Sequence, residues 1–191
     1  MINWCTTLKN FFSVAALIAL LFGFNPFATS AVLVSQSYLN NSDSFLSSVN
    51  GDFENAESFT LPNTANLTSI VWWGTNAGNT GANDFLVRIG TTLGAWTSLT
   101  GVVTRNATSG TDNEDRNIFR FEQAFTTTLP LIADTYFLSI SQETEDWFWT
   151  AGSLDATFGY SGSFFGADQD WFDDSTELSF QLVGEWQSSV V

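Results

Sequence analysis

The chain has 191 residues, with five cationic side chains, twenty acidic ones and no histidine, which gives a formal net charge of −15. The absence of histidine excludes Ser-His-Asp and Cys-His catalysis, His-ligated metals and a histidine general base. The acidic balance argues against nucleic acids and anionic membranes as partners, because phosphate binding requires Lys and Arg.

The first 31 residues have the order of a secretory signal peptide. Lys9 precedes an apolar run over 11–24, and the small residues 28–31 end in Ala31, as a signal-peptidase site requires. We predict cleavage after Ala31, which removes the only lysine and the only cysteine of the chain. An uncleaved anchor is the alternative, but the apolar run is shorter than the roughly twenty residues that span a bilayer. The predicted product is secreted or held at the cell surface, without insertion into the membrane.

The predicted mature segment, 32–191, contains four arginines, twenty acidic residues and no cysteine, so its formal net charge is −16. About 160 residues can bury a core that is large enough to fold without disulfides. The apolar side chains of this segment therefore have to supply its stability. We predict a single domain over 32–191.

Short runs of alternating apolar and polar residues predict about nine β-strands after the leader. In chain order the predicted strands are 32–37, 53–61, 67–74, 85–89, 102–106, 118–125, 136–141, 147–151 and 177–186. In the last of them, Leu178, Phe180 and Leu182 share one face, and Glu177 and Ser179 lie on the other. This is the pattern of a half-buried strand.

Two interior strands show the same period of two residues. The inward sets that it predicts are Phe85, Val87 and Ile89 in one strand, and Tyr136, Leu138 and Ile140 in the other. Arg88, Ser139 and Ser141 fall on the opposite faces of these strands.

Strands of this length, with turn-rich connections and almost no helical periodicity, predict an all-β fold, as an antiparallel β-sandwich or jelly roll. A parallel sheet would need crossover helices. The polar segments 74–83 and 109–117 are predicted loops, and 152–175 is an irregular, aromatic-rich stretch.

Six segments in this order resemble a known group of proteins. They are Glu57-Ser58-Phe59-Thr60-Leu61, Leu67-Thr68-Ser69-Ile70-Val71-Trp72-Trp73-Gly74, Asn83-Asp84-Phe85-Leu86-Val87-Arg88-Ile89, Ala133-Asp134-Thr135-Tyr136-Phe137-Leu138-Ser139-Ile140, Trp147-Phe148-Trp149 and Glu177-Leu178-Ser179-Phe180-Gln181-Leu182-Val183-Gly184. The series resembles exported bacterial β-sandwich proteins without an assigned function that commonly carry a PEP-CTERM sorting tail. The resemblance implies a bacterial source and provides no catalytic residues. The sequence ends at Val191 without the Pro-Glu-Pro motif of that tail, so we do not carry over membrane sorting.

Two pairs of tryptophans are candidates for stacking against a sugar ring. Trp72 and Trp73 are neighbours in a strand, so one must face the core and the other the outer face or the underside of a loop. Trp147 and Trp149 are two residues apart and share a face, which suits a flat aromatic platform. For both pairs burial in the core is the alternative, because buried indoles stabilise cores. We select Trp73, Trp147, Trp149 and Trp171 as candidate ligand-binding residues.

An acidic, aromatic segment over 168–174 is a candidate cation site. Carboxylate oxygens are the ligands that calcium prefers. The four candidate calcium ligands are Asp168, Asp170, Asp173 and Asp174. The spacing does not fit an EF-hand, which needs an oxygen ligand at Phe172 and a glycine at Asp173. A solvated acidic loop is the alternative, and we predict no required cofactor.

We predict a secreted, acidic, non-catalytic protein that recognises carbohydrate or another protein at the cell surface or in the extracellular matrix. Two alternatives stay open. The chain can be a self-associating structural protein, with 32–37 docking onto a neighbour's sheet, because strands with few charges offer edges for pairing. It can also be a carboxylate-dependent glycoside hydrolase, which would need two acids about 5 to 10 Å apart across a cleft.

Overall fold

The computed structural model describes residues 30–76, 83–153, 159–163, 171–173 and 177–187. The predicted signal peptide lies outside these ranges except for its last two residues, Ser30 and Ala31. Within the described ranges, the protein has no helix that is long and apolar enough to cross a membrane.

The described residues form thirteen strands. In chain order they are β1 (Ala31–Gln36), β2 (Ser44–Leu46), β3 (Phe53–Thr60), β4 (Ala65–Asn76), β5 (Phe85–Thr92), β6 (Ala95–Leu99), β7 (Gly101–Thr111), β8 (Asn117–Leu131), β9 (Thr135–Gln142), β10 (Trp147–Thr150), β11 (Gly159–Ser163), β12 (Phe172–Asp173) and β13 (Phe180–Trp186).

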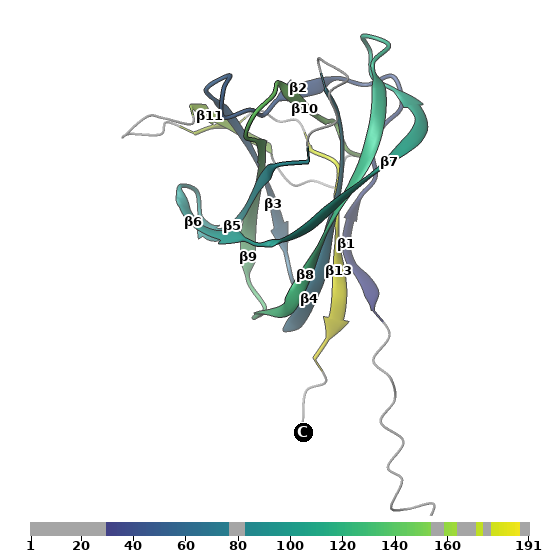
Figure 1. Ribbon diagram of the computed structural model, residues 1–191. Coiled ribbons are helices and arrows are strands. Elements are labelled where there is room, and N and C mark those ends of the chain that lie inside the picture. Colours follow the sequence, from purple (N-terminus) through teal and green to yellow (C-terminus); the bar gives the residue numbers. More distant parts are fainter. Residues whose placement is uncertain (1–29, 77–82, 154–158, 164–170, 174–176, 188–191) are drawn as a thin grey trace, which may run out of the picture.

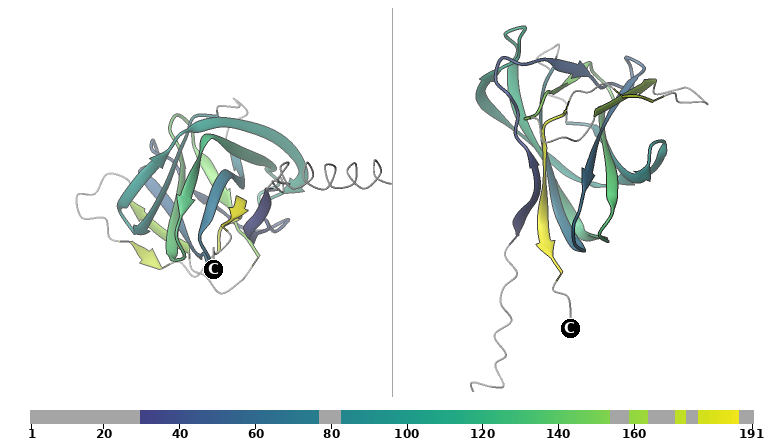
Figure 2. Two further views of the ribbon diagram at one scale, coloured as in Figure 1. Left: turned by 90° about the horizontal axis from the view of Figure 1, so that it is seen from below. Right: turned by 180° about the vertical axis from the view of Figure 1, so that it is seen from behind.

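One sheet contains seven strands with β4 at its centre. On one edge β4 pairs with β8, which pairs with β7. On the other edge it carries two strand pairs end to end, β13 with β1 and β10 with β2. The start of β1 and the end of β13 lie side by side at one end of the molecule (Figures 1 and 2).

The second sheet has six strands in the order β12-β11-β3-β9-β5-β6. All named strands in both sheets pair antiparallel with their neighbours. The two sheets lie face to face (Figure 1). The structure therefore confirms the predicted all-β class with antiparallel sheets packed as a sandwich.

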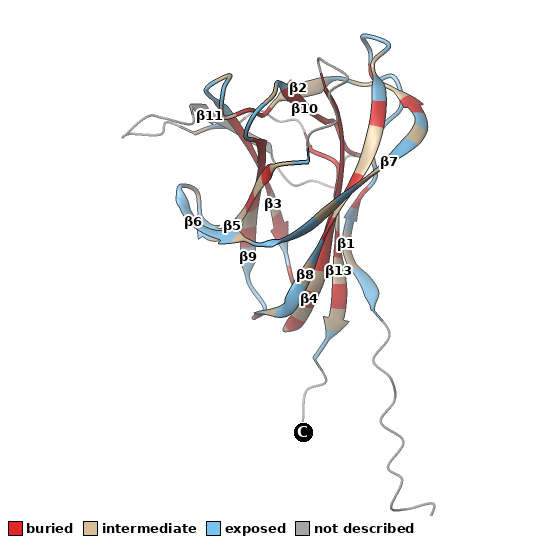
Figure 3. Cartoon of the chain, in the orientation of Figure 1, coloured by how far each residue is buried: buried red, intermediate tan, exposed pale blue. Residues whose placement is uncertain are grey.

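The core between the sheets contains aromatic and aliphatic side chains from both. Buried residues recur along the strands of both sheets (Figure 3). The ring centroids of Trp72 in β4 and Phe85 in β5 are 5.2 Å apart, and those of Phe59 in β3 and Phe180 in β13 are 5.8 Å apart. The inward residues predicted for 85–89, 136–141 and 177–186 all belong to this core.

The nine predicted strands are all present, as β1, β3, β4, β5, β7, β8, β9, β10 and β13. The sequence pattern missed β2, β6, β11 and β12. β2 and β12 have only three and two residues, and β11 is rich in Gly and Ser, so these three strands show no clear alternation of apolar and polar residues. The predicted loop over 109–117 is too long, because β7 continues to Thr111 and β8 begins at Asn117.

The half-buried character predicted for 177–186 is wrong at Glu177 and Ser179, which are both buried. The Ser179 hydroxyl donates to the Thr150 carbonyl at 2.8 Å, so the polar face of this strand is satisfied inside the protein. Ser139 and Ser141 are also fully buried, although they lie opposite the core-facing residues of β9. The outer face of the six-stranded sheet is therefore covered at these positions.

Asp112 holds the turn between β7 and β8, and its side chain is fully buried. Its Oδ1 accepts the backbone N–H groups of Glu114 and Arg116 at 3.0 and 2.9 Å, and its Oδ2 accepts Nε of Arg116 at 2.7 Å. Burial acts to raise the pKa of this carboxyl, but the Arg116 side chain and the backbone donors outweigh it. The pKa of Asp112 therefore lies below its ordinary value of 3.8.

Asp112→Asn is expected to lower the free energy of unfolding by about 1–2 kcal/mol at neutral pH, because it removes the charge that pairs with Arg116. The folded-state pKa is lower than the unfolded-state pKa. This stabilisation is therefore present above the unfolded pKa, near about 4, and is lost as the pH falls through the folded pKa. Urea unfolding of both proteins at neutral pH and at about pH 3 should show the difference shrinking on acidification.

The control is Glu114→Gln, because Glu114 is the exposed partner of Arg116, with 67% of its side chain accessible. Exposed ion pairs contribute little, so this variant should cost less than about 0.5 kcal/mol. Equal losses in the two variants, or a difference that does not change with pH, would contradict the role of Asp112.

Candidate functional site

The outer face of the six-stranded sheet is built by the same alternation that builds the core. Ala56 of β3 lies opposite Ser139 of β9, and Ser139 lies opposite Arg88 of β5. Their chain neighbours Val87 and Leu138 belong to the core between the sheets. The side chains of Ala56, Ser139 and Arg88 therefore share the outer face.

A buried ion pair crosses this face. Arg88 pairs with Glu54 of β3, and the Ser139 hydroxyl donates to the same carboxylate from the strand between them. The Glu54 side chain is completely buried, and only 14% of the Arg88 side chain is exposed. Charges removed from water to this extent need paired charges and hydrogen bonds to offset the lost hydration. Three neighbouring strands, rather than loops, hold these groups in position.

Two tryptophans lie beside the ion pair. The Arg88 guanidinium carbon is 5.3 Å from the centroid of the Trp96 ring, within cation–π range. Trp96 meets Trp171 edge-on, with centroids 5.9 Å apart and ring planes at 75°. Both residues are partly exposed, whereas their Nε1 atoms are buried and have no hydrogen-bond partner among the described residues. We call Trp96, Trp171, Arg88, Glu54 and Ser139 the outer aromatic cluster.

The indole contact joins segments from opposite edges of the sheet. Trp96 lies in β6, the last strand at one edge, and Trp171 immediately precedes β12, the last strand at the other. Phe137 of β9 and Tyr160 of β11 make a second ring contact, with centroids 5.4 Å apart. The sheet has to curve around its outer face for its two edges to meet in this way.

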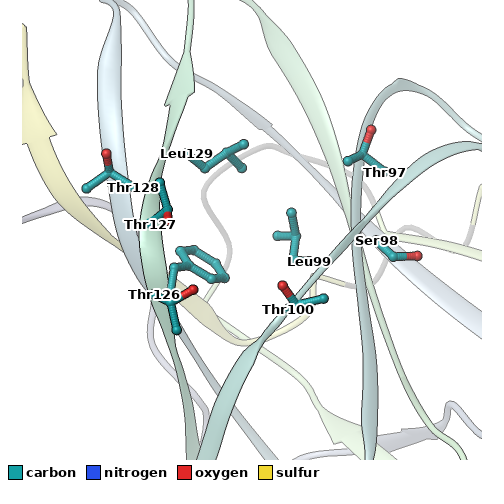
Figure 4. Close-up of a pocket in the computed structure, with 9 residues that line it drawn as sticks. Thr97, Ser98, Leu99, Thr100, Thr126, Thr127, Thr128 and Leu129 are labelled. Carbon is teal, nitrogen blue, oxygen red and sulfur yellow. The ribbon is translucent and has the colours of Figure 1, made fainter.

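A separate hollow of about 250 Å³ lies between β6 and β8 (Figure 4). Its lining residues are Thr97, Ser98, Leu99, Thr100, Phe125, Thr126, Thr127, Thr128 and Leu129. All nine carry either a hydroxyl group or an apolar side chain. The lining therefore offers hydrogen bonds and apolar contact, and it contains no acid or base for proton transfer.

Trp147 and Trp149, the predicted platform, are fully buried in the core between the sheets. The Trp149 indole N–H donates to the Ser179 carbonyl at 2.8 Å. An indole packed on all sides cannot stack against a ligand. The prediction that they bind a ligand is therefore wrong, and both residues belong to the core.

Trp72 and Trp73 face opposite ways, as predicted. Trp72 is in the main core, whereas Trp73 belongs to a smaller apolar cluster with Val71 and Ile118 on the other face of β4. Tyr38 packs on Trp73 with ring centroids 5.7 Å apart, and only 8% of Trp73 is exposed. Trp73 therefore does not present an open stacking surface.

The predicted calcium ligands fall almost wholly outside the described residues. Asp168, Asp170 and Asp174 are outside them, and only the backbone of Asp173 is described, as part of β12. Among the described side chains, no group of three or more Asp, Glu, His or Cys residues could hold a metal ion. The calcium site over 168–174 stays a prediction.

Sequence reasoning selected Trp171 but missed Trp96, Glu54 and the role of Arg88. The sequence feature that could have indicated this site is Arg88, which is a single charge on the outward face of an apolar strand. Its partner Glu54 is 34 residues away in the chain, and Trp96 lies in a strand that was not predicted. No local pattern connects these residues.

No protein-family model matches the chain, and no curated protein sequence matches it. Among solved structures it is similar to AvmM, which catalyses macrocyclization in alchivemycin A biosynthesis. The two sequences are 9% identical, and the match covers 85% of this chain and 92% of that chain with a TM-score of 0.27. A structural similarity at this level does not support an inference about function, so the function has to be inferred from the site.

Proposed function

We propose that this protein is exported and recognises carbohydrate without catalysis, through the outer aromatic cluster. The observation that carries the proposal is the contact of two partly exposed indoles, Trp96 and Trp171, beside the buried Glu54–Arg88 pair. The predicted signal peptide over 1–31 and the resemblance to exported bacterial β-sandwich proteins support a secreted or cell-surface location.

The chemistry of the cluster suits a sugar ring, which has apolar C–H faces and a rim of hydroxyl groups. The indole planes of Trp96 and Trp171 meet at 75°, so they form a corner and not a flat platform. A ring can place one face on one indole and its edge against the other. The Arg88 guanidinium, which keeps some exposed surface, can orient hydroxyl groups by hydrogen bonding.

The arrangement of Glu54 favours binding over hydrolysis. Its carboxylate already engages Arg88 and Ser139, and the chain contains no histidine that could transfer protons. Glycoside hydrolysis uses two carboxyl groups, one of which exchanges a proton with the substrate or with water. A buried carboxylate in this arrangement is better suited to holding the Arg88 guanidinium in position.

Trp171→Ala is expected to weaken the binding of a recognised polysaccharide by about tenfold or more, because it removes one wall of the indole corner. A panel of neutral and acidic polysaccharides in affinity electrophoresis identifies the ligand, and isothermal titration measures the loss. Trp186→Ala is the matched control, because Trp186 is 39% exposed and lies in β13 of the other sheet.

Failure of every polysaccharide to bind the wild-type protein would refute the proposal, and so would equal losses in the two tryptophan variants. Release of reducing sugar during the titration would instead favour the hydrolase alternative.

Self-association is a second candidate, favoured by the edge strand β1. In the described part of the chain β1 pairs only with β13, and its Val32 is 53% exposed. A free edge with an exposed apolar residue can pair with a second sheet. A dimer in light scattering that becomes a monomer when 32–37 is deleted would favour this function, and a monomeric wild-type protein would count against it.

A further inference from the structure

The hollow lies on the other side of β6 from the outer aromatic cluster. Thr97 and Leu99 lie opposite the core residues Ile89 and Val87 of β5, so they face the space between the sheets. The volume of about 250 Å³ is below the range of roughly 300–1,000 Å³ that is usual for drug-sized ligands. The hollow therefore has room for a single small ring.

The backbone of β8 shapes one wall of the hollow. β7 begins at Gly101, opposite Phe125, so the β8 residues that follow Phe125 have no partner on β7. On its other edge β8 bulges out of the ladder, because residues 125–128 lie opposite Thr68 alone. This irregularity places three consecutive threonines along the hollow (Figure 4).

The lining has two kinds of chemistry. Leu99, Phe125 and Leu129 are partly buried and pack against the main core, and Leu99 and Leu129 point toward one another from the two walls (Figure 4). The remaining lining residues carry hydroxyl groups, and they are Thr97, Ser98, Thr100, Thr126, Thr127 and Thr128. Ser98 lies opposite Arg88, so its hydroxyl faces the outer side of the sheet. Within the described part of the chain the threonine hydroxyls make no hydrogen bond to another residue, so they are available to a ligand.

The charge of the hollow differs from that of the protein around it. The chain has a formal net charge of −15, whereas none of the nine lining residues is charged. A charged ligand would lose hydration on entry and would find no opposite charge in the lining. Anions are in addition repelled by the net negative charge of the chain. The lining therefore selects an uncharged ligand.

We propose that this hollow is a second carbohydrate site, which binds one ring of a neutral saccharide. The apolar face of the ring packs on Leu99, Phe125 and Leu129, and its hydroxyl groups exchange hydrogen bonds with the threonines of both walls. The inference rests on the proposed function for its class of ligand, but its geometry does not depend on the outer aromatic cluster.

The test is a nuclear magnetic resonance titration of the isotopically labelled protein with the methyl glycosides of neutral hexoses. We expect saturable shifts of the backbone amides of 97–100 and 125–129. Methyl glucuronide, which adds a charge to the same kind of ring, should bind at least about tenfold more weakly. Thr127→Val keeps the shape of the exposed side chain and removes its hydroxyl, so it should weaken hexose binding about three- to fivefold.

Trp171→Ala separates the two sites, because it should leave the hexose shifts at the hollow unchanged. Shifts confined to the neighbourhood of Trp96 and Trp171 would overturn the second site and leave the proposed function standing. Shifts at the hollow alone, with no effect of Trp171→Ala on polysaccharide binding, would support the second site and overturn the proposed role of the outer aromatic cluster. Equal binding of the glucuronide, unchanged affinity in both Thr127→Val and Thr97→Val, or no saturable shift at the hollow would each overturn the inference.

Discussion

Replacing Trp147 with alanine is expected to lower the free energy of unfolding by about 3–5 kcal/mol. The indole is fully buried, and its ring centroid lies 5.2 Å from that of Phe85 and 6.2 Å from that of Phe121. It also packs directly on the bare backbone of Gly74, where an added Cβ would come within 2.3 Å of Cζ2 of Trp147. Truncation to alanine therefore leaves a cavity in the core, and urea unfolding measures the loss.

Trp186→Ala is the control for this prediction. Trp186 is 39% exposed, so its loss should cost less than about 1 kcal/mol. If Trp147→Ala were as stable as the wild-type protein and had lost polysaccharide binding, the sequence-based assignment of Trp147 to a ligand platform would be restored, and the assignment to the core would fail.

Glu54→Ala is expected to cost about 3 kcal/mol of unfolding free energy, because it removes the carboxylate that pairs with Arg88 in a mostly buried position. It also takes away the acceptor of the Ser139 hydroxyl, which is itself fully buried. The loss should be accompanied by a change in tryptophan fluorescence, since Arg88 stacks over Trp96. Chemical unfolding followed by fluorescence reports both effects.

Two further variants isolate the contribution of the charge. Glu54→Gln keeps the size of the side chain and an acceptor for Ser139, so it should be less destabilising than Glu54→Ala. The double variant Glu54→Gln with Arg88→Met removes both charges. It should lower the free energy of unfolding by less than the sum of the two single variants, because each single variant leaves an unpaired charge and the double variant leaves none. Strict additivity, or a cost of Glu54→Ala below about 1 kcal/mol, would show that the ion pair contributes little.

The strand pattern was predictable because each core-facing strand repeats every two residues. Phe85, Val87 and Ile89 are buried together, as are Leu178, Phe180 and Leu182, and their spacing alone indicates both the strand and its inward face. The opposite orientation of Trp72 and Trp73 follows from the same geometry, and the structure confirms it.

The strands that escaped prediction are those whose sequences show no clear alternation of apolar and polar residues. β11 and β12 extend the six-stranded sheet beyond β3 through backbone hydrogen bonds, which do not depend on side-chain alternation. β6 forms a hairpin with β5, but its sequence Ala95-Trp96-Thr97-Ser98-Leu99 does not alternate, and it carries Trp96 to the outer face. The candidate site could not be predicted for the same reason, because Trp96 lies in β6 and Trp171 immediately precedes β12.

The all-β class and the inward faces of the main strands can be inferred from the sequence, because the strands repeat every two residues. Their antiparallel pairing follows from the lack of helical periodicity between them, since parallel strands need crossover connections. The tertiary structure is needed to show that Trp147 and Trp149 belong to the core, and that Trp171 meets Trp96 across the outer face. It is also needed to show that Glu54 and Arg88 form a buried pair. Alternation defines which side of a strand a residue faces, but the curvature of the sheets and the pairing of distant strands determine what covers that side.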